Sequence, residues 1–295
     1  MKHHRITALL LITMLLFSQG SRAEIAVLLH GLLSSSGNWE ESGAMHALQE
    51  MGWERAGRIR SGGPTGILLS TAQQPPRGNR HLYLADIPTL IPLEQQRDLL
   101  EQMLQRISSN YPEERLVLIA HSAGGVVSRM VVQQNNIQQL QALITVASPH
   151  LGSPYANWAY DLATLPFPLR LLPKLVAEEK YQLLRKSRPM IKGLSVAQPG
   201  TLLHWLNQQP HPPIHYLSIT RQQPHSKQNQ TLVPEWSQDM NRVPAIKGLG
   251  TTIPTRAPHS ITMQDGYLIG SLLNHWITLP PHSYHSLYLN NRASN

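Results

Sequence analysis

A serine at a sharp break in the chain is the residue best placed to do chemistry. Ser122 follows the apolar run 116–120, whose branched side chains are typical of a buried parallel strand. Small residues flank this serine, and the apolar stretch 126–134 after it has the composition of a helix. A strand, a tight turn and a helix together form the context in which a serine hydroxyl is presented as a nucleophile. The pattern therefore predicts that Ser122 forms a covalent intermediate with its substrate.

A second strand ends in a glycine turn that could supply hydrogen-bond donors to that reaction. The apolar run 25–29 leads into His30-Gly31-Leu32. By itself, this arrangement would indicate only a turn. In an acyl-transfer site, however, such a glycine lets the next backbone amide point at a developing oxyanion. We therefore expect the N–H groups of Leu32 and Ala123 to form an oxyanion hole beside Ser122.

The elements that must position these residues alternate between strand and helix. Strands are expected near 25–29, 55–60, 81–85, 116–120, 140–146, 214–220 and 244–247, and helices near 39–51, 92–110, 126–134 and 261–276. This alternation predicts an α/β protein with a doubly wound, mostly parallel sheet. Active groups of such sheets collect at the carboxyl ends of the strands, where His30, Ser122 and the segment 148–152 should meet.

Residues 153–213 interrupt the alternation. The segment is dense in Leu, Pro and Trp, which predicts several short helices inserted as a cap. Two interpretations stay open, because both need apolar residues at helical spacing. The cap is either a helical unit packed on the core or a lid whose inner face holds an acyl chain.

Composition excludes several classes of function. Hydrophobic residues make up 41% of the 295 residues and charged residues 14%, as in a globular protein with one sizeable core. The net charge is +8, but the basic residues are scattered, which argues against nucleic-acid binding and fits transient contact with an anionic membrane surface better. The chain has no cysteine and no His, Asp and Glu cluster at metal-ligand spacing, so we expect neither a metal nor a thiol site.

The first 23 residues have the pattern of a secretory signal peptide. Lys2 and Arg5 precede an uncharged apolar stretch, 6–17, and Ser21-Arg22-Ala23 places small residues where a signal peptidase cuts. The apolar stretch is shorter than the about 20 residues that span a bilayer. We expect export to the periplasm or the medium, with an uncleaved membrane anchor as the alternative.

Four segments together resemble the lipase and esterase branch of the α/β-hydrolase superfamily. They are His30-Gly-Leu32, His121–Gly125, Thr145–Gly152 and Val233-Pro234 followed by His259. The resemblance covers nearly all of residues 24–277. It implies an α/β-hydrolase domain over 24–295 with the cap at about 153–213, and hydrolysis of a small-molecule ester or lipid through an acyl-enzyme without a cofactor. Ala120 stands where the usual motif begins with glycine.

The resemblance also identifies a general base. In this fold the catalytic residues follow the chain order serine, acid, histidine. His259 lies in a short loop between the last expected strand and the last helix, which is where similar enzymes keep the catalytic histidine. The resemblance therefore implies that His259 removes the proton from Ser122.

The acid of the triad is the point at which this sequence departs from similar lipases. Those enzymes often carry Asp-Gly-x-Val-Pro, and the aligned positions here are Gln230 and Thr231. Glutamine can accept a hydrogen bond from imidazole, but it carries no charge to stabilise an imidazolium. Five residues between Ser122 and His259 are acidic: Asp161, Glu178, Glu179, Glu235 and Asp239.

Position in the chain narrows these five acids to two. The first three belong to the expected cap and not to a strand end. We therefore expect Glu235, directly after Val233-Pro234, to be the triad acid. Asp239, or an uncharged Gln230 or Asn229, is the alternative.

Two other functions are compatible with the same residues. A protein with this fold that has lost its acid could bind a ligand without turnover. An acyltransferase would pass the acyl group to an alcohol instead of water.

Overall fold

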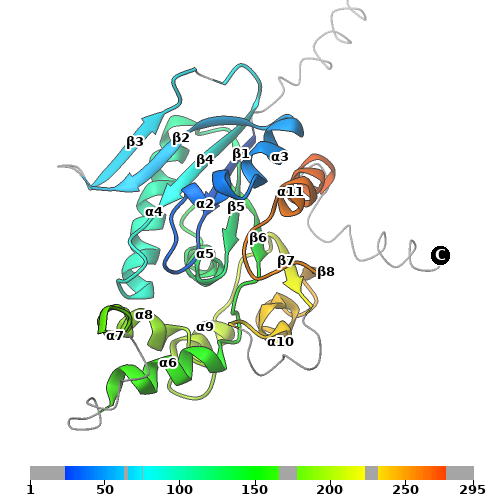
Figure 1. Ribbon diagram of the computed structural model, residues 1–295. Helices are drawn as coiled ribbons and strands as arrows, with labels where there is room; N and C mark the ends of the chain where they lie inside the picture. Colours follow the sequence, from blue (N-terminus) through cyan, green and yellow to red (C-terminus); the bar gives the residue numbers. More distant parts are fainter. Residues whose placement is uncertain (1–23, 63–65, 75, 166–177, 223–231, 277–295) are drawn as a thin grey trace, which may run out of the picture.

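An eight-stranded sheet forms the centre of the computed structural model, which describes residues 24–62, 66–74, 76–165, 178–222 and 232–276 (Figure 1). The strands are β1 (Glu24–Leu29), β2 (Glu54–Ser61), β3 (Ile67–Thr71), β4 (Arg80–Asp86), β5 (Arg115–His121), β6 (Leu140–Val146), β7 (His215–Arg221) and β8 (Gly250–Thr255). They are ordered β3-β2-β4-β1-β5-β6-β7-β8. Among the described strands, β2 and β3 pair antiparallel and the other neighbours pair parallel. The predicted doubly wound, mostly parallel sheet is confirmed.

Helices cover both faces of this sheet. They are α2 (Gly37–Glu41), α3 (Ala44–Glu50), α4 (Leu93–Asn110), α5 (Ala123–Gln134), α6 (Pro154–Thr164), α7 (Glu178–Lys186), α8 (Arg188–Gly193), α9 (Leu202–Gln208), α10 (Glu235–Gln238), η3 (Met240–Arg242) and α11 (Met263–Trp276). Alternate residues of β1 divide the core between the faces. Val27 and Leu29 belong to the cluster formed with α4 and α5, whereas Ala26 and Leu28 belong to the cluster formed with α3 and α11. Because side chains alternate along a strand, one apolar run supplies both clusters.

Two expected elements differ from the structure, and one strand of the structure was not expected. The helix predicted at 39–51 is two helices, because Gly43 between them has φ 78°. The strand predicted at 244–247 was wrong, since these residues form turns and the strand is β8. The apolar residues Val243 and Ile246 in this region are buried in a turn. The side chain of Asn241 closes the turn by hydrogen bonds with the backbone of Gly250. Strand β3, on the sheet edge, was not expected, because most of its side chains are only partly buried.

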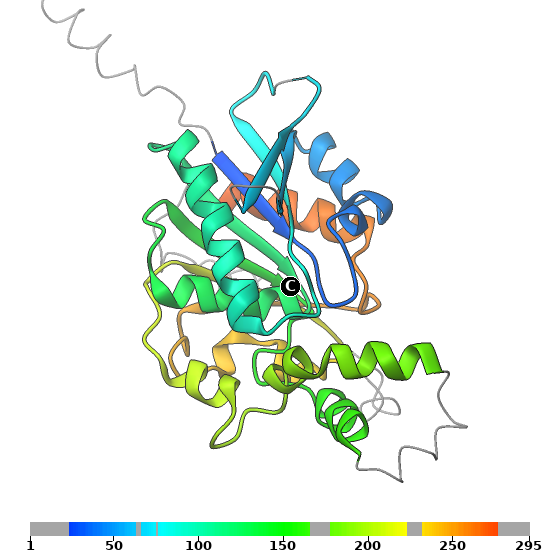
Figure 2. The same cartoon turned by 90° about the vertical axis from the view of Figure 1, so that its left-hand side faces the viewer.

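The cap segment contributes α6, α7, α8 and α9, which lie beyond the ends of β5 and β6 (Figures 1 and 2). A backbone hydrogen bond joins the start of α6 to the end of α8, since Ser153 N donates to Leu194 O at 2.9 Å. Gly193 of α8 lies against Leu93, the first residue of α4. Because α4 begins at the carboxyl edge of the sheet, after β4, α8 packs beside the edge where Ser122 is located.

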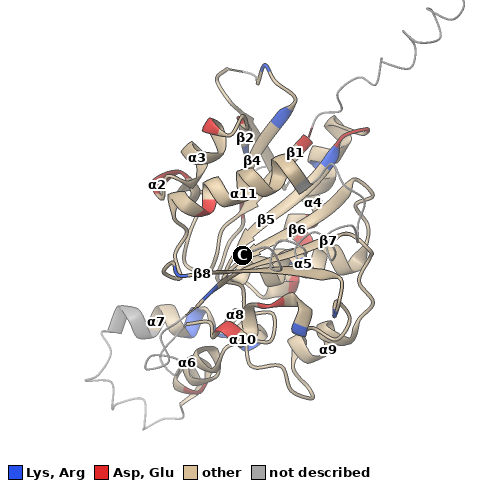
Figure 3. Cartoon of the chain, turned by 90° about the vertical axis from the view of Figure 1, so that its right-hand side faces the viewer, with Lys and Arg blue, Asp and Glu red and all other residues tan. Residues whose placement is uncertain are grey.

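The remaining sequence expectations concern charge and membrane insertion. Figure 3 shows acidic and basic residues interspersed along the ribbon. Among the described residues, no helix is both long and apolar enough to span a bilayer. The predicted signal peptide at 1–23 lies outside the described residues.

The close packing after Ser122 gives the first prediction. A Cβ at Gly124 would lie 2.3 Å from the backbone oxygen of His30, and backbone cannot move aside as a flexible side chain can. We expect Gly124→Ala to lower the free energy of unfolding by about 1–3 kcal/mol, measured by urea denaturation. The matched control is Gly37→Ala, whose new Cβ would meet its nearest described neighbour at 3.3 Å. Equal urea midpoints for the two variants would contradict the packing argument.

Candidate active site

Ser122 occupies a strained turn between β5 and α5. Its backbone has φ 52° and ψ −127°, in a region that residues other than glycine seldom adopt. Its amide donates to Val146 O at 2.8 Å, so the neighbouring strand end fixes the turn. The side chain of Ser122 is consequently presented above the carboxyl edge of the sheet, as a nucleophile at such an elbow requires.

The structure brings His259 to this serine from a distant part of the chain. His259 lies between β8 and α11, and its Nε2 is 3.0 Å from Ser122 Oγ. That distance is a normal hydrogen bond. A neutral imidazole in this place can accept the hydroxyl proton while the oxygen attacks a carbonyl carbon.

The surroundings of His259 favour its neutral form. Burial, together with the positive charge of Arg221, lowers the pKa of His259 to about 4. The adjacent His121 donates from Nε2 to His259 O at 2.8 Å. Burial and the neighbouring His259 also lower the pKa of His121, to about 3. Both imidazoles are therefore uncharged at neutral pH, and one positions the backbone of the other.

The two predicted oxyanion donors belong to segments that adjoin Ser122, because Ala123 follows it and a Cβ at Gly31 would lie 2.9 Å from Ser122 Cβ. Ala123 is the first residue of α5, so its N–H has no acceptor within the helix and adds to the positive end of the helix dipole. The Gly31–Leu32 peptide follows His30, whose buried imidazole donates from Nδ1 to Gly31 O at 3.0 Å and accepts from Ile87 N at 3.3 Å. The bond from His30 Nδ1 to Gly31 O fixes the orientation of the Gly31–Leu32 peptide. The role of Leu32 and Ala123 remains a prediction.

The predicted acid does not contact His259 among the described residues. Glu235 is the first residue of α10, and its side chain is exposed. Asp239 is engaged elsewhere, since its Oδ1 accepts from Asn241 N at 2.9 Å and from Thr252 Oγ1 at 2.6 Å. Gln230 and Asn229 lie outside the described residues. The identity of the triad acid therefore stays a prediction.

Two acidic residues near the site have roles that sequence reasoning did not identify in full. Asp86 accepts from the amide and hydroxyl of Ser36 at 2.6 and 2.8 Å, which closes the loop after Leu32. Asp265 pairs with the buried Arg221 beside the His259 loop. A threonine three residues before Asp265 is a helix-start signal, but no local pattern shows that Arg221 reaches it.

Comparisons with known proteins agree with this architecture. A family profile described as a PGAP1-like alpha/beta domain matches residues 91–165, which contain Ser122. A lipase from Bacillus licheniformis in its mature form is similar, with a TM-score of 0.55 and 15% identity over 87% of this chain and 92% of that one. The protein has the α/β-hydrolase fold. No curated protein matches the sequence.

Two further solved structures show the same relation. The product of gene lin2722 from Listeria innocua has a TM-score of 0.54 and 13% identity, over 90% of this chain and 92% of that one. An esterase from Pyrococcus furiosus has a TM-score of 0.50 and 16% identity, over 87% of this chain and 82% of that one. The resemblance to lipases and esterases that the sequence motifs predicted is confirmed at the level of the fold.

Buried histidines make the stability of this hydrolase fold depend on pH. Burial lowers the pKa of His211 and His259 from 6.5 to about 4 and that of His121 to about 3. Between pH 6.5 and 4 the unfolded chain therefore binds protons that the native state does not. Stability should fall as the pH is lowered through this window, by up to about 1.4 kcal/mol per pH unit for each group.

Urea denaturation at several values between pH 7.5 and 4.5 measures this dependence. Replacing Ser109 of α4, an exposed residue that does not titrate, with alanine provides a control that should leave the slope unchanged. A flat profile would contradict the burial of neutral histidines.

Proposed function

We propose that this protein is a serine hydrolase that cleaves carboxylic, lipid-like esters through an acyl-enzyme. The observation that carries the proposal is the 3.0 Å contact between His259 Nε2 and Ser122 Oγ at the strained turn. Residues that meet in this way from distant segments can activate a hydroxyl that is otherwise a weak nucleophile. The structural similarity to a lipase and an esterase supports the same reaction class.

The reaction follows from these positions. Ser122 Oγ attacks the ester carbonyl carbon while its proton passes to His259 Nε2. The amides of Leu32 and Ala123 donate to the resulting oxyanion. The alcohol then leaves with the proton held by His259. A water molecule, deprotonated by the same imidazole, attacks the acyl-enzyme, releases the carboxylic acid and restores the serine.

The cap is proposed to supply the surface for the acyl chain. Tyr155 and Trp158 of α6 are 47% and 55% exposed, and their rings lie 5.4 Å apart. Ser153 at the start of α6 donates to the backbone of Leu232, whose side chain is 48% exposed. Apolar side chains at the carboxyl edge are suited to an acyl chain that leaves water. The predicted export and a transient contact with the membrane surface fit a lipid substrate.

Labelling and turnover by the same serine test the proposal. We expect the purified protein to react with a fluorophosphonate probe and to hydrolyse p-nitrophenyl esters, with longer acyl chains preferred over C2 across a series to C16. Ser122→Ala should abolish both reactions, because no other group would form the covalent intermediate.

The matched control is Ser109→Ala, which changes an exposed serine of α4 and should leave both reactions unchanged. Turnover by the Ser122→Ala variant above a trace of the wild-type rate would refute the assignment. A wild-type protein that does not label would instead be a binding protein, and labelling without ester hydrolysis would indicate an acyltransferase.

Glu235 is proposed as the triad acid. Loss of the charge of the triad acid lowers turnover about 10⁴-fold in a serine protease, so we expect Glu235→Gln to lower kcat at least about 10²-fold. Asp239→Asn, the control, should have a much smaller effect because Asp239 is bonded to Thr252. If both substitutions are silent and Gln230→Asp raises kcat, an uncharged side chain orients His259 and the assignment of Glu235 is wrong.

A further inference from the structure

The loop that carries His259 is fixed by a buried ion pair. This loop, residues 256–262, connects β8, which ends at Thr255, with α11, which begins at Met263. A general base has to be held within about 0.5 Å of its productive position. No carboxylate among the described residues is hydrogen-bonded to the His259 ring, but the described residues do restrain the backbone of its loop.

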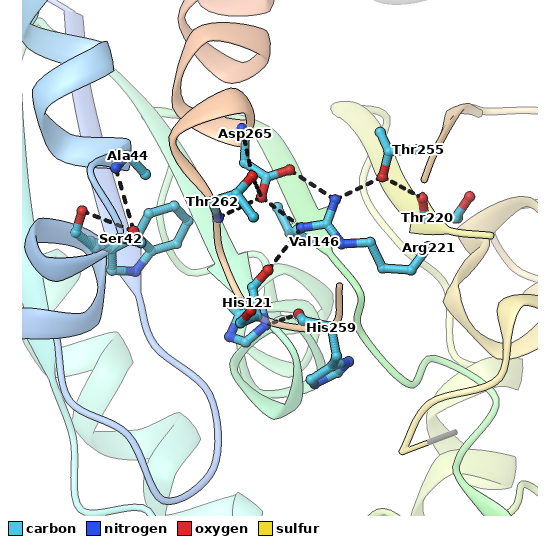
Figure 4. Close-up of polar contacts among 12 residues, drawn as sticks. Ser42, Ala44, His121, Val146, Thr220, Arg221, Thr255, His259, Thr262 and Asp265 are labelled. Carbon is cyan, nitrogen blue, oxygen red and sulfur yellow. Dashed lines mark hydrogen bonds and ion pairs between the residues drawn. The ribbon is translucent and has the colours of Figure 1, made fainter. Parts of the chain in front are cut away.

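Arg221 contacts this loop at its start and within it. The residue ends β7, and its side chain is 1% exposed. Its Nη1 donates to Thr255 Oγ1 at 2.7 Å, and its Nη2 donates to Ser260 O at 3.4 Å. Ser260 directly follows His259. The planar guanidinium thus reaches both the strand end and the residue beside the base, as Figure 4 shows for its bond to Thr255.

Asp265 completes the restraint from the far end of the loop. Its side chain is 3% exposed, and its two oxygens accept from Arg221 Nη1 at 2.8 Å and Nη2 at 2.7 Å. Its Oδ2 also accepts from the amide and the hydroxyl of Thr262, at 2.8 and 2.9 Å. The ion pair is therefore bidentate, and it joins the ends of β7 and β8 to the start of α11.

We propose that Arg221 and Asp265 are positioning residues that orient His259 toward Ser122 through the backbone of its loop. The proposal rests on the proposed function, since it concerns how the base of that reaction is held. The bond from His121 to His259 O fixes the same loop from the side of β5. The pair contacts neither Ser122 nor the His259 ring by a described hydrogen bond, so neither of its members is a catalytic residue.

The pair also affects His259 by charge. Arg221 lowers the pKa of His259, next to the larger effect of burial. Among the described residues, the titratable and charged groups near this imidazole are His121, whose pKa burial lowers to about 3, and the paired Arg221 and Asp265. Removing the guanidinium should therefore raise the pKa of His259.

The double variant Arg221→Met/Asp265→Leu tests the positioning role. Apolar residues of similar volume often replace a buried ion pair without loss of stability, so the variant should fold. We expect amide hydrogen exchange of residues 256–262 to rise at least about tenfold and kcat to fall at least about tenfold with little change in KM. The His259 ring signal, assigned in NMR spectra with His259→Gln, should titrate at a higher pH.

Two further variants separate the effect of the geometry of the Arg221 guanidinium from the effect of its charge and from a general loss of an ion pair. Arg221→Lys keeps the charge but lacks the planar fork, so exchange should rise while His259 still titrates near pH 4. Glu24→Leu/Arg80→Met is the matched control, because it removes an ion pair at the beginnings of β1 and β4. It should change none of the three measurements.

Unchanged exchange in residues 256–262 and an unchanged His259 titration in Arg221→Met/Asp265→Leu would overturn the positioning role. Exchange and titration do not depend on ester turnover. If the wild-type protein neither labels nor hydrolyses esters, the proposed function fails, while these two measurements still decide whether the pair positions His259. If the double variant does not fold, amide exchange of residues 256–262 in the Arg221→Lys variant decides, and unchanged exchange there would overturn the positioning role.

Discussion

The backbone conformation of Ser122 is the constraint on which the rest of this structure depends. A positive φ at a residue with a side chain costs free energy, and the surrounding packing must compensate for it. The bond from Ser122 N to Val146 O and the close approach of Gly124 to the backbone of His30 provide that packing. Three strand ends, those of β1, β5 and β6, therefore meet at one residue. The same contacts hold the turn after β1, which contains the predicted donor Leu32, against the segment of Ser122.

Burial of imidazole and guanidinium groups is the second constraint on the candidate site. In a medium of low dielectric constant the charged form of histidine is disfavoured, which keeps His30, His121 and His259 neutral donors and acceptors at fixed positions. The permanent charge of Arg221 is tolerated in the same region because Asp265 neutralises it with two hydrogen bonds. An acid of the triad ordinarily orients the histidine directly. In the arrangement proposed here, the Arg221–Asp265 pair orients the loop that carries His259 and does not contact the imidazole ring.

Local sequence predicted the central part of the site because the causes are local. The apolar strand, the small residues and the helix around Ser122 lie within one stretch, so a strained turn could be recognised without tertiary contacts. The helix at 92–110 was equally evident from its apolar face. By contrast, Gly43 divided an expected helix, and the apolar residues near 244 were placed in a strand when they are buried in a turn. Burial alone does not distinguish a strand from a loop, because both remove apolar side chains from water.

The sequence by itself determined the parallel α/β sheet and the presence of a serine at a strand-to-helix turn, since both follow from short-range patterns. It also indicated His259, but only through the order of residues in similar enzymes. Tertiary structure alone decided that His259 Nε2 lies 3.0 Å from a serine 137 positions away, and that Arg221 pairs with Asp265 across 44 positions. Such contacts depend on which strands become neighbours in the sheet. Strand pairing is set by the packing of the whole chain, so no window of the sequence contains that information.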